Sequence, residues 1–203
     1  MGGASTQIAF VTTDTNRPDD EINITINHTA YHIFSHSFLE LGQDQARKAI
    51  SATPSATNCY PNGYTVGSQI GNFDFSTCSP IYTEMIQGHN IAKQMIPTEG
   101  QSFVAYAGIY YTYSFFNILK TPTQSALQSQ INATCYQPWE ALQRHYPSTS
   151  LAFLSSYCAN AVYFDSLLYN TYQLQEYQLN VTNEINGTGI DWTLGALLYS
   201  LLS

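Results

Sequence analysis

The sequence has few basic residues. Among 203 residues, six are Lys or Arg and fourteen are Asp or Glu, which gives a formal charge of -8. A surface that neutralises a polynucleotide backbone needs clustered Lys and Arg side chains at the phosphates. We therefore expect no nucleic-acid binding. A small phosphorylated ligand stays possible, because backbone N–H groups and a metal ion can hold phosphate without many basic side chains.

Long hydrophobic runs and closely spaced cysteine pairs are also absent. No stretch reaches the roughly 20 apolar residues that cross a bilayer, and no leader segment is visible at residue 1, so we expect no membrane span in this chain. Cys59, Cys78, Cys135 and Cys158 include no Cys-x-x-Cys pair, which argues against a zinc knuckle. Disulfides are the better interpretation, and four cysteines allow three pairings.

The remaining composition is that of a globular chain in an oxidising compartment. It is 44% hydrophobic and 14% aromatic, and its length can bury a single substantial core. Together with the even number of cysteines, glycosylation sequons favour an extracellular or secretory-lumen protein. These sequons begin at Asn23, Asn27, Asn132, Asn180 and Asn186.

Three histidines recur every four residues, at His28, His32 and His36. On a helix this spacing would align them as metal ligands. The surrounding β-branched alternation predicts a strand instead, on which residues four apart lie roughly 13 Å from each other. A zinc site is therefore disfavoured.

The segment Met1–Gln7 combines small residues with polar ones. Gly2 and Gly3 can take positive φ and carry no Cβ, so consecutive backbone N–H groups could converge on an anion. If a strand begins at Ser5, period-two alternation puts Ser5 and Gln7 on one face. By itself this pattern also fits an ordinary hairpin turn.

The string Gly-Gly-Ala-Ser-Thr-Gln resembles the fourth conserved motif of the apyrase, or ecto-nucleoside triphosphate diphosphohydrolase, family. The resemblance implies a two-lobed actin/hexokinase-like (ribonuclease H-like) α/β fold. It also implies release of phosphate from nucleoside tri- and diphosphates with Ca or Mg. In this interpretation Gly2, Gly3 and Ala4 cradle phosphate, while Ser5 and Gln7 hold the attacking water.

Further strings are similar to the same family. They are His36-Ser37-Phe38-Leu39 followed by Asp44-Gln45-Ala46, the string Cys135-Tyr136-Gln137-Pro138-Trp139-Glu140, and Trp192-Thr193-Leu194-Gly195. The resemblance selects the disulfides Cys59–Cys78 and Cys135–Cys158. It gives Trp192 a hydrogen bond to a water on the catalytic metal, for which an indole N–H is suited as a donor.

The resemblance also suggests where a base would bind. Within the aromatic segment 102–116 it selects Tyr110 as the side chain that stacks on the nucleotide base. Where some relatives place an arginine beside the base, this chain has Asn170, so we expect no cationic clamp there. Trp139 is expected to fill the core.

Hydrophobic periodicity predicts a β-meander followed by helices. Thr121, followed by Pro122, is expected to cap a helix, and residues 51–100 are expected to form a disulfide-stapled insertion. The predicted strands are 8–11, 22–27 and 31–35, and segment 102–116 is predicted as a buried helix or a helix and turn. The other predicted helices are 44–50, 81–96, 122–133, 138–145, 151–168 and 191–198, the last with Asp191 as its cap.

The whole chain, 1–203, is thus predicted to be the carboxyl-terminal lobe of a nucleoside tri- and diphosphate hydrolase. The family motif usually follows Asp and Leu or Met, so Met1 falls inside a predicted hairpin and an amino-terminal lobe is the expected partner. That lobe would carry the general base, so the chain alone is expected to be inactive. The alternative is a truncated, noncatalytic module that binds a nucleotide or a partner.

Overall fold

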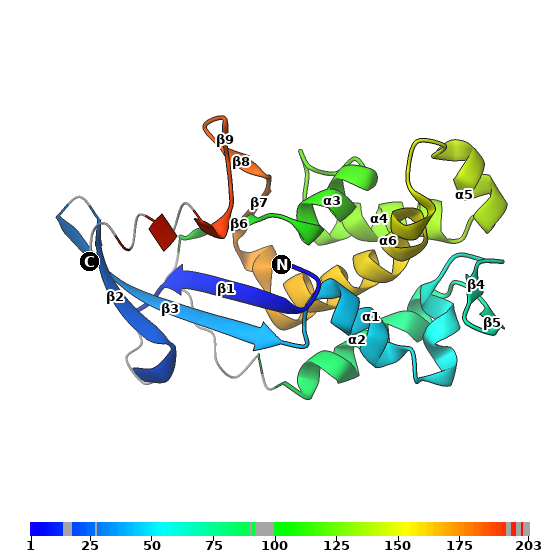
Figure 1. The fold of residues 1–203 in the computed structure, drawn as a ribbon, viewed down its shortest axis with the longest axis horizontal. Coiled ribbons are helices and arrows are strands. Elements are labelled where there is room, and N and C mark those ends of the chain that lie inside the picture. The colour runs from blue at the N-terminus through cyan, green and yellow to red at the C-terminus, as the bar shows by residue number, and fades with distance from the viewer. Residues whose placement is uncertain are drawn as a thin grey trace.

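The computed structural model describes residues 1–13, 18–26, 28–89, 91, 100–193, 196–197 and 200. A three-stranded sheet forms one half of this part and a group of helices forms the other (Figure 1). The mixed α/β class is as predicted. No helix in the described part of the chain is long and apolar enough to cross a membrane.

The three-stranded sheet is antiparallel, with the strand order β1-β3-β2. Along β1, Thr6, Ile8 and Phe10 are buried and the residues between them are not, which confirms the predicted alternation. Ser5 and Gln7 therefore share the opposite face. The strands are β1 (Ser5–Val11), β2 (Glu21–Ile26) and β3 (Thr29–Leu39), with a 3-10 turn, η1 (Pro18–Asp20), before β2.

Strand β2 forms where it was predicted, but its isoleucines do not enter the core. Ile22 is 37% exposed and Ile26 is 46% exposed, although Asn23 is exposed as expected. The reason is its place at the edge of the sheet, where only β3 lies beside it. Asn27 lies outside the described residues.

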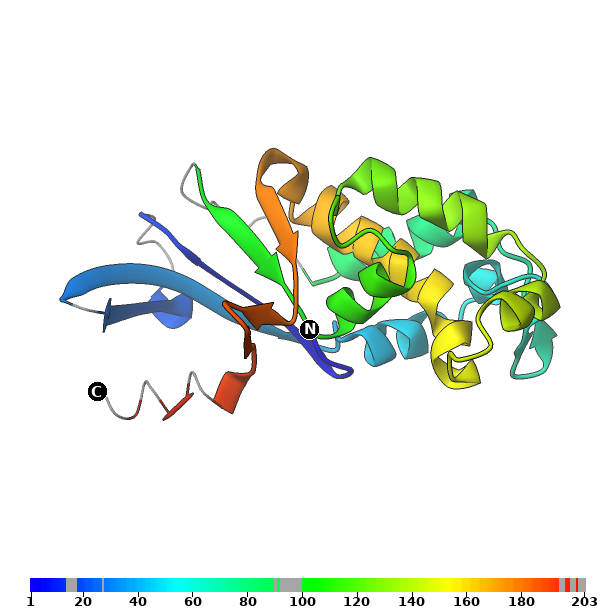
Figure 2. The same cartoon turned by 90° about the horizontal axis from the view of Figure 1, so that it is seen from above.

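The segment predicted as a helix or a helix and turn over 102–116 begins instead as a strand, β6 (Ser102–Ala105), and becomes helical only in α3 (Gly108–Phe115). Phe103 and Ala105 are buried and their neighbours are exposed, which is a strand's period of two. The strand pairs in parallel with β7 (Gln178–Val181), and this pair lies beside β1 (Figure 2).

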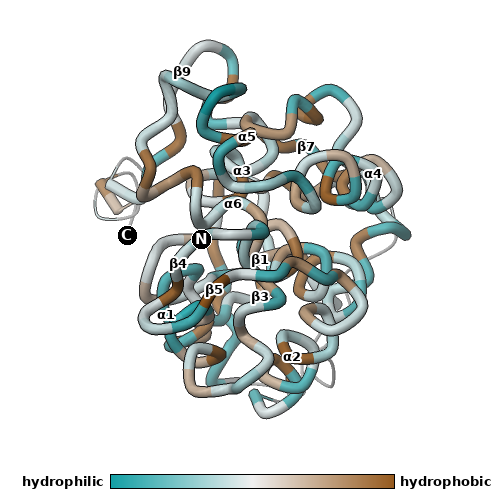
Figure 3. The backbone as a smooth tube through the Cα atoms, turned by 90° about the vertical axis from the view of Figure 1, so that its right-hand side faces the viewer, coloured by the Kyte–Doolittle hydropathy of each residue, from teal (hydrophilic) through white to brown (hydrophobic). Residues whose placement is uncertain are grey.

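Helix α6 (Leu151–Phe164) is the centre of the helical half, and helices from the rest of the chain surround it (Figure 3). Its residues from Cys158 to Phe164 are all buried. The helix continues as a π-helical segment, η4 (Asp165–Thr171), so the predicted helix over 151–168 is confirmed in position. A central helix buried all round explains why this stretch is apolar on every face.

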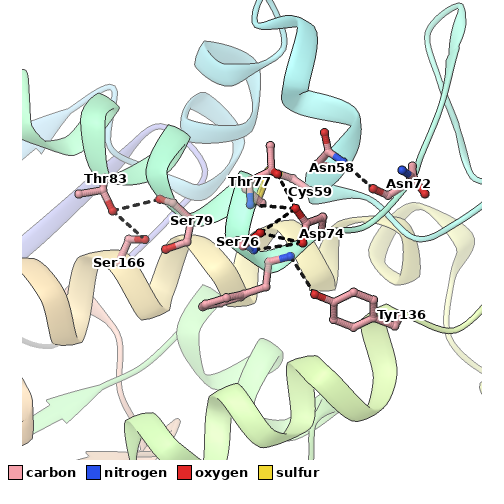
Figure 4. The surroundings of a disulfide bond; sticks show 12 residues. Asn58, Cys59, Asn72, Asp74, Ser76, Thr77, Ser79, Thr83, Tyr136 and Ser166 are labelled. Carbon is pink, nitrogen blue, oxygen red and sulfur yellow. Dashed lines mark hydrogen bonds between the residues drawn. A yellow bond between two sulfur atoms is a disulfide. The ribbon is translucent and has the colours of Figure 1, made fainter.

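The helix predicted over 81–96 starts six residues earlier, as α2 (Phe75–Gln87), while residues 92–99 lie outside the described part. Asp74 sets this start, because its carboxylate accepts hydrogen bonds from the N–H groups of Ser76 (3.3 Å) and Thr77 (3.1 Å) (Figure 4). Cys78, Tyr82 and Ile86 of α2 are buried against the rest of the core.

Helix α4 starts two residues later than its predicted start at Pro122. Thr123, not Thr121, is the cap, because its hydroxyl accepts from the N–H of Ala126 at 3.2 Å. The other elements are α1 (Gln43–Ile50), η2 (Pro54–Cys59), β4 (Thr65–Val66), β5 (Gln69–Ile70), α4 (Gln124–Cys135), α5 (Trp139–His145), η5 (Leu174–Glu176), β8 (Glu184–Ile185) and β9 (Thr188–Gly189).

Both predicted disulfides are present. Cys59 bonds to Cys78, which ties η2 to α2, and Cys135 bonds to Cys158, which ties α4 to α6. All four cysteine side chains are buried. Disulfides of this kind persist in oxidising compartments, which fits an extracellular location.

Candidate functional site

The turn at Gly2 and Gly3 is held against the first turn of α1. The carbonyl of Gly2 accepts from the N–H of Gln43 (3.0 Å), and that of Gly3 accepts from Asp44 (3.0 Å) and Gln45 (3.1 Å). The turn therefore caps a helix that has no side-chain cap. Because its carbonyls point at α1, the N–H of Gly3 is left without an acceptor in the described part of the chain.

Close packing against neighbouring atoms, and not a left-handed backbone conformation, explains why glycine occupies positions 3 and 42. Neither Gly2 nor Gly3 has positive φ, in contrast to the predicted possibility. A Cβ on Gly3 would overlap the carboxylate of Asp44, and one on Gly42 would overlap the carbonyl of Gly3. A Cβ on Gly2 would meet nothing within 4 Å, so this face of the turn is open to a ligand.

Ser5 and Gln7 form a hydrogen-bonded pair beside this turn. The Gln7 amide donates to Ser5 Oγ at 2.6 Å and to Ser37 Oγ at 3.0 Å. Ser37 lies directly opposite Gln7 on β3. With both amide hydrogens used, the Gln7 side-chain carbonyl remains an acceptor and the Ser5 O–H remains a donor. Together they can accept from and donate to one water molecule.

A pocket of about 620 Å³ brings Gly2 together with the predicted water-site and indole residues, whereas Gly3 and Ala4 do not line it. We call it the Ser5–Trp192 pocket, because Gly2, Ser5, Gln7 and Trp192 all line it. Trp192 is 77% exposed and follows Asp191, whose carboxylate accepts from the N–H of Thr193 at 2.8 Å. The predicted Asp191 cap is thus present, although residues 194–195 and 198–199 lie outside the described part.

A second pocket, of about 750 Å³, adjoins the first. Both are lined by Met1, Gly2, Ala107 and Tyr111, so Tyr111 stands between them. We call the second the Arg47–Phe153 pocket. Tyr111 is 58% exposed and Phe153 is 63% exposed, which leaves two aromatic faces available to a flat ligand in one pocket.

One fixed positive charge lies in the Arg47–Phe153 pocket. The Arg47 guanidinium is paired with Asp44, Nη2 to Oδ1 at 2.5 Å, and its Nη1 donates to the side-chain oxygen of buried Asn160. Burial raises the pKa of Tyr157, and Tyr111 adds to this rise, so the Tyr157 hydroxyl stays protonated at neutral pH.

The structure does not bring every predicted site residue to these pockets. Tyr110 is half-buried against the core and lines neither pocket, whereas its neighbour Tyr111 lines both. Asn170 lies on η4, where its side-chain oxygen accepts a hydrogen bond from Gln124 (3.2 Å). It also lines neither pocket. Trp139, which was expected to fill the core, is only half-buried and packs edge-on against Tyr64.

Four residues of the site were missed from the sequence: Ser37, Arg47, Tyr111 and Phe153. Ser37 could have been found by carrying the strand alternation from Gln7 to its cross-strand partner. Arg47 follows Asp44 by three residues on a predicted helix, which is the spacing of an ion pair. No sequence signal distinguishes Tyr111 or Phe153 from other exposed aromatics.

The described residues alone do not supply a set of cation ligands. They include no group of three His, Cys, Asp or Glu side chains that could hold a metal ion. The one carboxylate that lines the Ser5–Trp192 pocket, Asp191, already accepts from Thr193. An indole N–H only donates, so Trp192 can reach a cation only through a water.

Two of the three regularly spaced histidines are bonded to neighbours on the sheet, and the third, His28, lies in the turn before β3. His32 contacts Asn23 (2.9 Å) and Glu21 (3.3 Å), and His36 contacts Asp20 (2.5 Å). These partners lie away from the pockets described above.

The structure thus combines an open glycine turn, a pair of groups able to orient a water molecule, and an adjoining pocket with two exposed aromatic rings. Sequence comparison gives the class a name. A model of the GDA1/CD39 (nucleoside phosphatase) family matches residues 1–80 and 78–203, and the chain belongs to that family.

Individual relatives agree with this membership. The chain is 26% identical to "Probable apyrase 3" of Arabidopsis thaliana, over 100% of the chain and 51% of the relative. It is also 26% identical to "Ectonucleoside triphosphate diphosphohydrolase 2" of Mus musculus, over 98% of the chain and 49% of the relative, and to "Ectonucleoside triphosphate diphosphohydrolase 3" of Homo sapiens, over 98% and 46%. The chain thus spans about half the length of these relatives.

Proposed function

We propose that this chain is the carboxyl-terminal lobe of an apyrase-type enzyme that releases phosphate from nucleoside tri- and diphosphates. The observation that carries the proposal is the Ser5–Trp192 pocket, which is lined by Gly2, Ser5, Gln7 and Trp192 from opposite ends of the chain. Membership of a nucleoside phosphatase family and relatives named as apyrases and diphosphohydrolases support it.

The residues of this pocket, and Gly3 and Ala4 of the turn beside it, have distinct tasks in the proposal. Gly2, Gly3 and Ala4 hold phosphate through their backbone, because the turn is open on the side away from α1. Ser5 donates to the attacking water and the Gln7 carbonyl accepts from it, which fixes its orientation for in-line attack. Trp192 donates to a water on the metal ion.

The Arg47–Phe153 pocket holds the nucleoside. We assign the base to the exposed rings of Tyr111 and Phe153, in place of the Tyr110 predicted from the sequence. Stacking on aromatic faces tolerates any base. The pocket joins the first at Gly2 and Tyr111, so a nucleotide can extend from one into the other.

The other half of the family's length completes the enzyme in this proposal. The family is generally dependent on a divalent cation, and we propose Ca or Mg, which supplies charge neutralisation at the phosphates when bound. Its carboxylate ligands and the general base come from an amino-terminal lobe, as in a two-lobed actin/hexokinase-like fold. The location is extracellular or in the secretory lumen, in keeping with the two disulfides.

The test is phosphate release from ATP and ADP with Mg or Ca, by this chain alone and by a protein that also carries the amino-terminal lobe. We expect release only from the longer protein, lost by about 100-fold or more in Ser5→Ala. If neither protein released phosphate while both still bound nucleotide, the result would favour the alternative that this chain is a noncatalytic binding module. Turnover by the chain alone would show that it contains its own base.

A further inference from the structure

Asn183 lies in the loop between β7 and β8 and joins two segments of the Ser5–Trp192 pocket. Its side-chain oxygen accepts a hydrogen bond from the N–H of Ala107 (3.1 Å), at the junction of β6 and α3. Its backbone carbonyl accepts from the N–H of Ile190 (2.8 Å), which leads into Trp192. All four of these residues line the pocket. Asn183 therefore holds the two segments together.

The junction that Asn183 holds has a strained backbone. Ala107 has φ 55° and ψ −122°, a conformation that its Cβ makes unfavourable. The next peptide group is bonded as well, since the N–H of Gly108 donates to the carbonyl of Met1 (3.1 Å). Strain of this kind persists only where surrounding contacts determine the geometry. The hydrogen bond to Asn183 is one of these contacts.

The same hydrogen bond defines the orientation of the Asn183 amide. A backbone N–H only donates, so the atom that faces Ala107 is the amide oxygen, and the NH₂ group lies on the other branch of the side chain. This NH₂ group has no acceptor among the residues that the structure describes. Asn183 is half-buried and lines the Ser5–Trp192 pocket, so the donor is available to a ligand there.

The Ser5–Trp192 pocket offers an anion neutral donors and no basic side chain. None of its described lining residues is Lys, Arg or His, and its one carboxylate, Asp191, accepts from the N–H of Thr193. An N–H group that is held in place can stabilise an anion without carrying a charge itself. The NH₂ group of Asn183 is such a donor, because its amide is already fixed by Ala107.

The position of Asn183 indicates which part of a nucleotide it would contact. Asn183 lines the Ser5–Trp192 pocket but not the Arg47–Phe153 pocket, whereas Ala107, to which it is bonded, lines both. Asn183 therefore lies beside the junction of the two pockets. When a base occupies the Arg47–Phe153 pocket, the phosphate attached to the nucleoside is the group that reaches this junction.

We propose that Asn183 is a nucleotide-binding residue, whose NH₂ group donates a hydrogen bond to an oxygen of the phosphate next to the nucleoside. This phosphate is not attacked in ATP or in ADP, so the hydrogen bond is equally strong in the ground state and in the transition state. A contact of that kind lowers KM and leaves kcat unchanged. The assignment rests on the proposed function, because it takes a nucleotide as the ligand of the two pockets.

The test compares Asn183→Asp with Asn186→Asp in the protein that carries both lobes. In Asn183→Asp an oxygen still accepts from Ala107, but the donor is lost and an anion faces the phosphate. We expect KM for ATP and ADP, and Kd for the non-hydrolysable analogue α,β-methylene-ADP, to rise about tenfold or more, while kcat changes less than about twofold.

Asn186→Asp is the matched control, because it makes the same change of charge three residues away. Asn186 lies at the turn of the β8–β9 hairpin, which projects from the molecule (Figure 1), and it lines neither pocket. Its KM and Kd should equal those of the wild type. An equal loss of affinity in both variants would overturn the assignment, because the added charge alone would then explain it.

Asn183→Ala separates support of the backbone from binding of the ligand. It removes both the acceptor for Ala107 and the donor, so we expect a lower unfolding temperature than in Asn183→Asp, together with weaker binding of the analogue. If Asn183→Asp binds the analogue as the wild type does and only Asn183→Ala is impaired, Asn183 merely supports Ala107 and the assignment is wrong.

Failure of the proposed function gives a different result. If the wild type binds the analogue but releases no phosphate from ATP or ADP, the hydrolase function is wrong, and weaker binding by Asn183→Asp still supports the phosphate contact. If the wild type hydrolyses ATP and Asn183→Asp has the same KM, the hydrolase function stands and the role of Asn183 is wrong. A wild type that neither binds nor hydrolyses nucleotides would contradict both.

Discussion

At the scale of single residues, the proposed water site depends on how the Gln7 amide is oriented. Ser5 and Ser37 accept both of its hydrogens, which turns the carbonyl toward the pocket. In Ser37→Ala one acceptor is lost and the amide gains freedom to rotate. We expect kcat to fall about fivefold with KM unchanged, because a hydrogen bond contributes about 1 kcal/mol. The measurement is phosphate release by the two-lobed protein.

Ser35 provides the control for this change. It lies two residues away on the same exposed face of β3, opposite Ala9, and its side chain does not contact Gln7. Ser35→Ala should leave both kcat and KM unchanged. An equal loss in both variants would mean that the serines act through the sheet's stability and not through Gln7.

Tyr111 and Tyr110 allow a second comparison at this scale. Tyr111 is exposed between the two pockets, whereas Tyr110 packs on the core. A stacked base is worth about 1 to 3 kcal/mol, so Tyr111→Ala should weaken binding of a fluorescent nucleoside diphosphate about tenfold in a titration. Tyr110→Ala should instead lower the unfolding temperature. The opposite result would restore Tyr110 as the base-stacking residue.

At the scale of elements, the sequence predicts structure well where one face is buried and the other is not. Strand β1 was predictable because its alternation is complete. Residues 102–105 were not, because a short strand followed by an apolar helix leaves one continuous hydrophobic run. The helix therefore starts at Gly108, six residues later than Ser102.

The start of α2 gives a prediction for an element. Asp74 accepts from two backbone N–H groups and from the hydroxyls of Ser76 and Thr77 (Figure 4). Asp74→Ala leaves these donors without the cap and should lower the free energy of unfolding by about 1 kcal/mol in urea denaturation. Asp74→Asn keeps an acceptor and should lose less. If Asp74→Ala and the wild type had the same free energy of unfolding, the disulfide at Cys78 alone would determine where α2 starts.

At the scale of the whole molecule, the candidate site was predictable in part. Gly2, Ser5, Gln7 and Trp192 were predicted from the sequence, and the fold brings them to one pocket, whereas Gly3 and Ala4 of the same predicted turn do not line it. The Arg47–Phe153 pocket was not predictable, because Arg47 and Phe153 meet Tyr111 only after α1, α3 and α6 pack together. The position of these residues side by side depends on tertiary packing, which the spacing of residues along the sequence does not predict.

The stability of the whole fold should depend on pH through buried Asp165. Burial raises the pKa of this carboxyl, and hydrogen bonds from Gln124, Gln128 and Asn170 only partly oppose the rise. The unfolded chain therefore loses this proton at lower pH than the folded chain does, and unfolding becomes more favourable as pH rises from about 4 through the folded pKa. Asp165→Asn removes the ionisable group and with it this pH dependence, and the asparagine oxygen can still accept a hydrogen bond from Gln128.

We therefore expect Asp165→Asn to match the wild type near pH 4 and to be increasingly more stable at higher pH, up to a plateau, when urea denaturation is repeated across pH. Asp74 supplies a control of opposite sign. Hydrogen bonds from Thr77 and Ser76 lower its pKa, so its stabilisation is present above about pH 4 and is lost as pH falls through the lowered value. If Asp165→Asn is less stable than wild type at neutral pH, the ionised carboxylate stabilises the joint between α4 and η4, and its hydrogen bonds outweigh the cost of burying the charge.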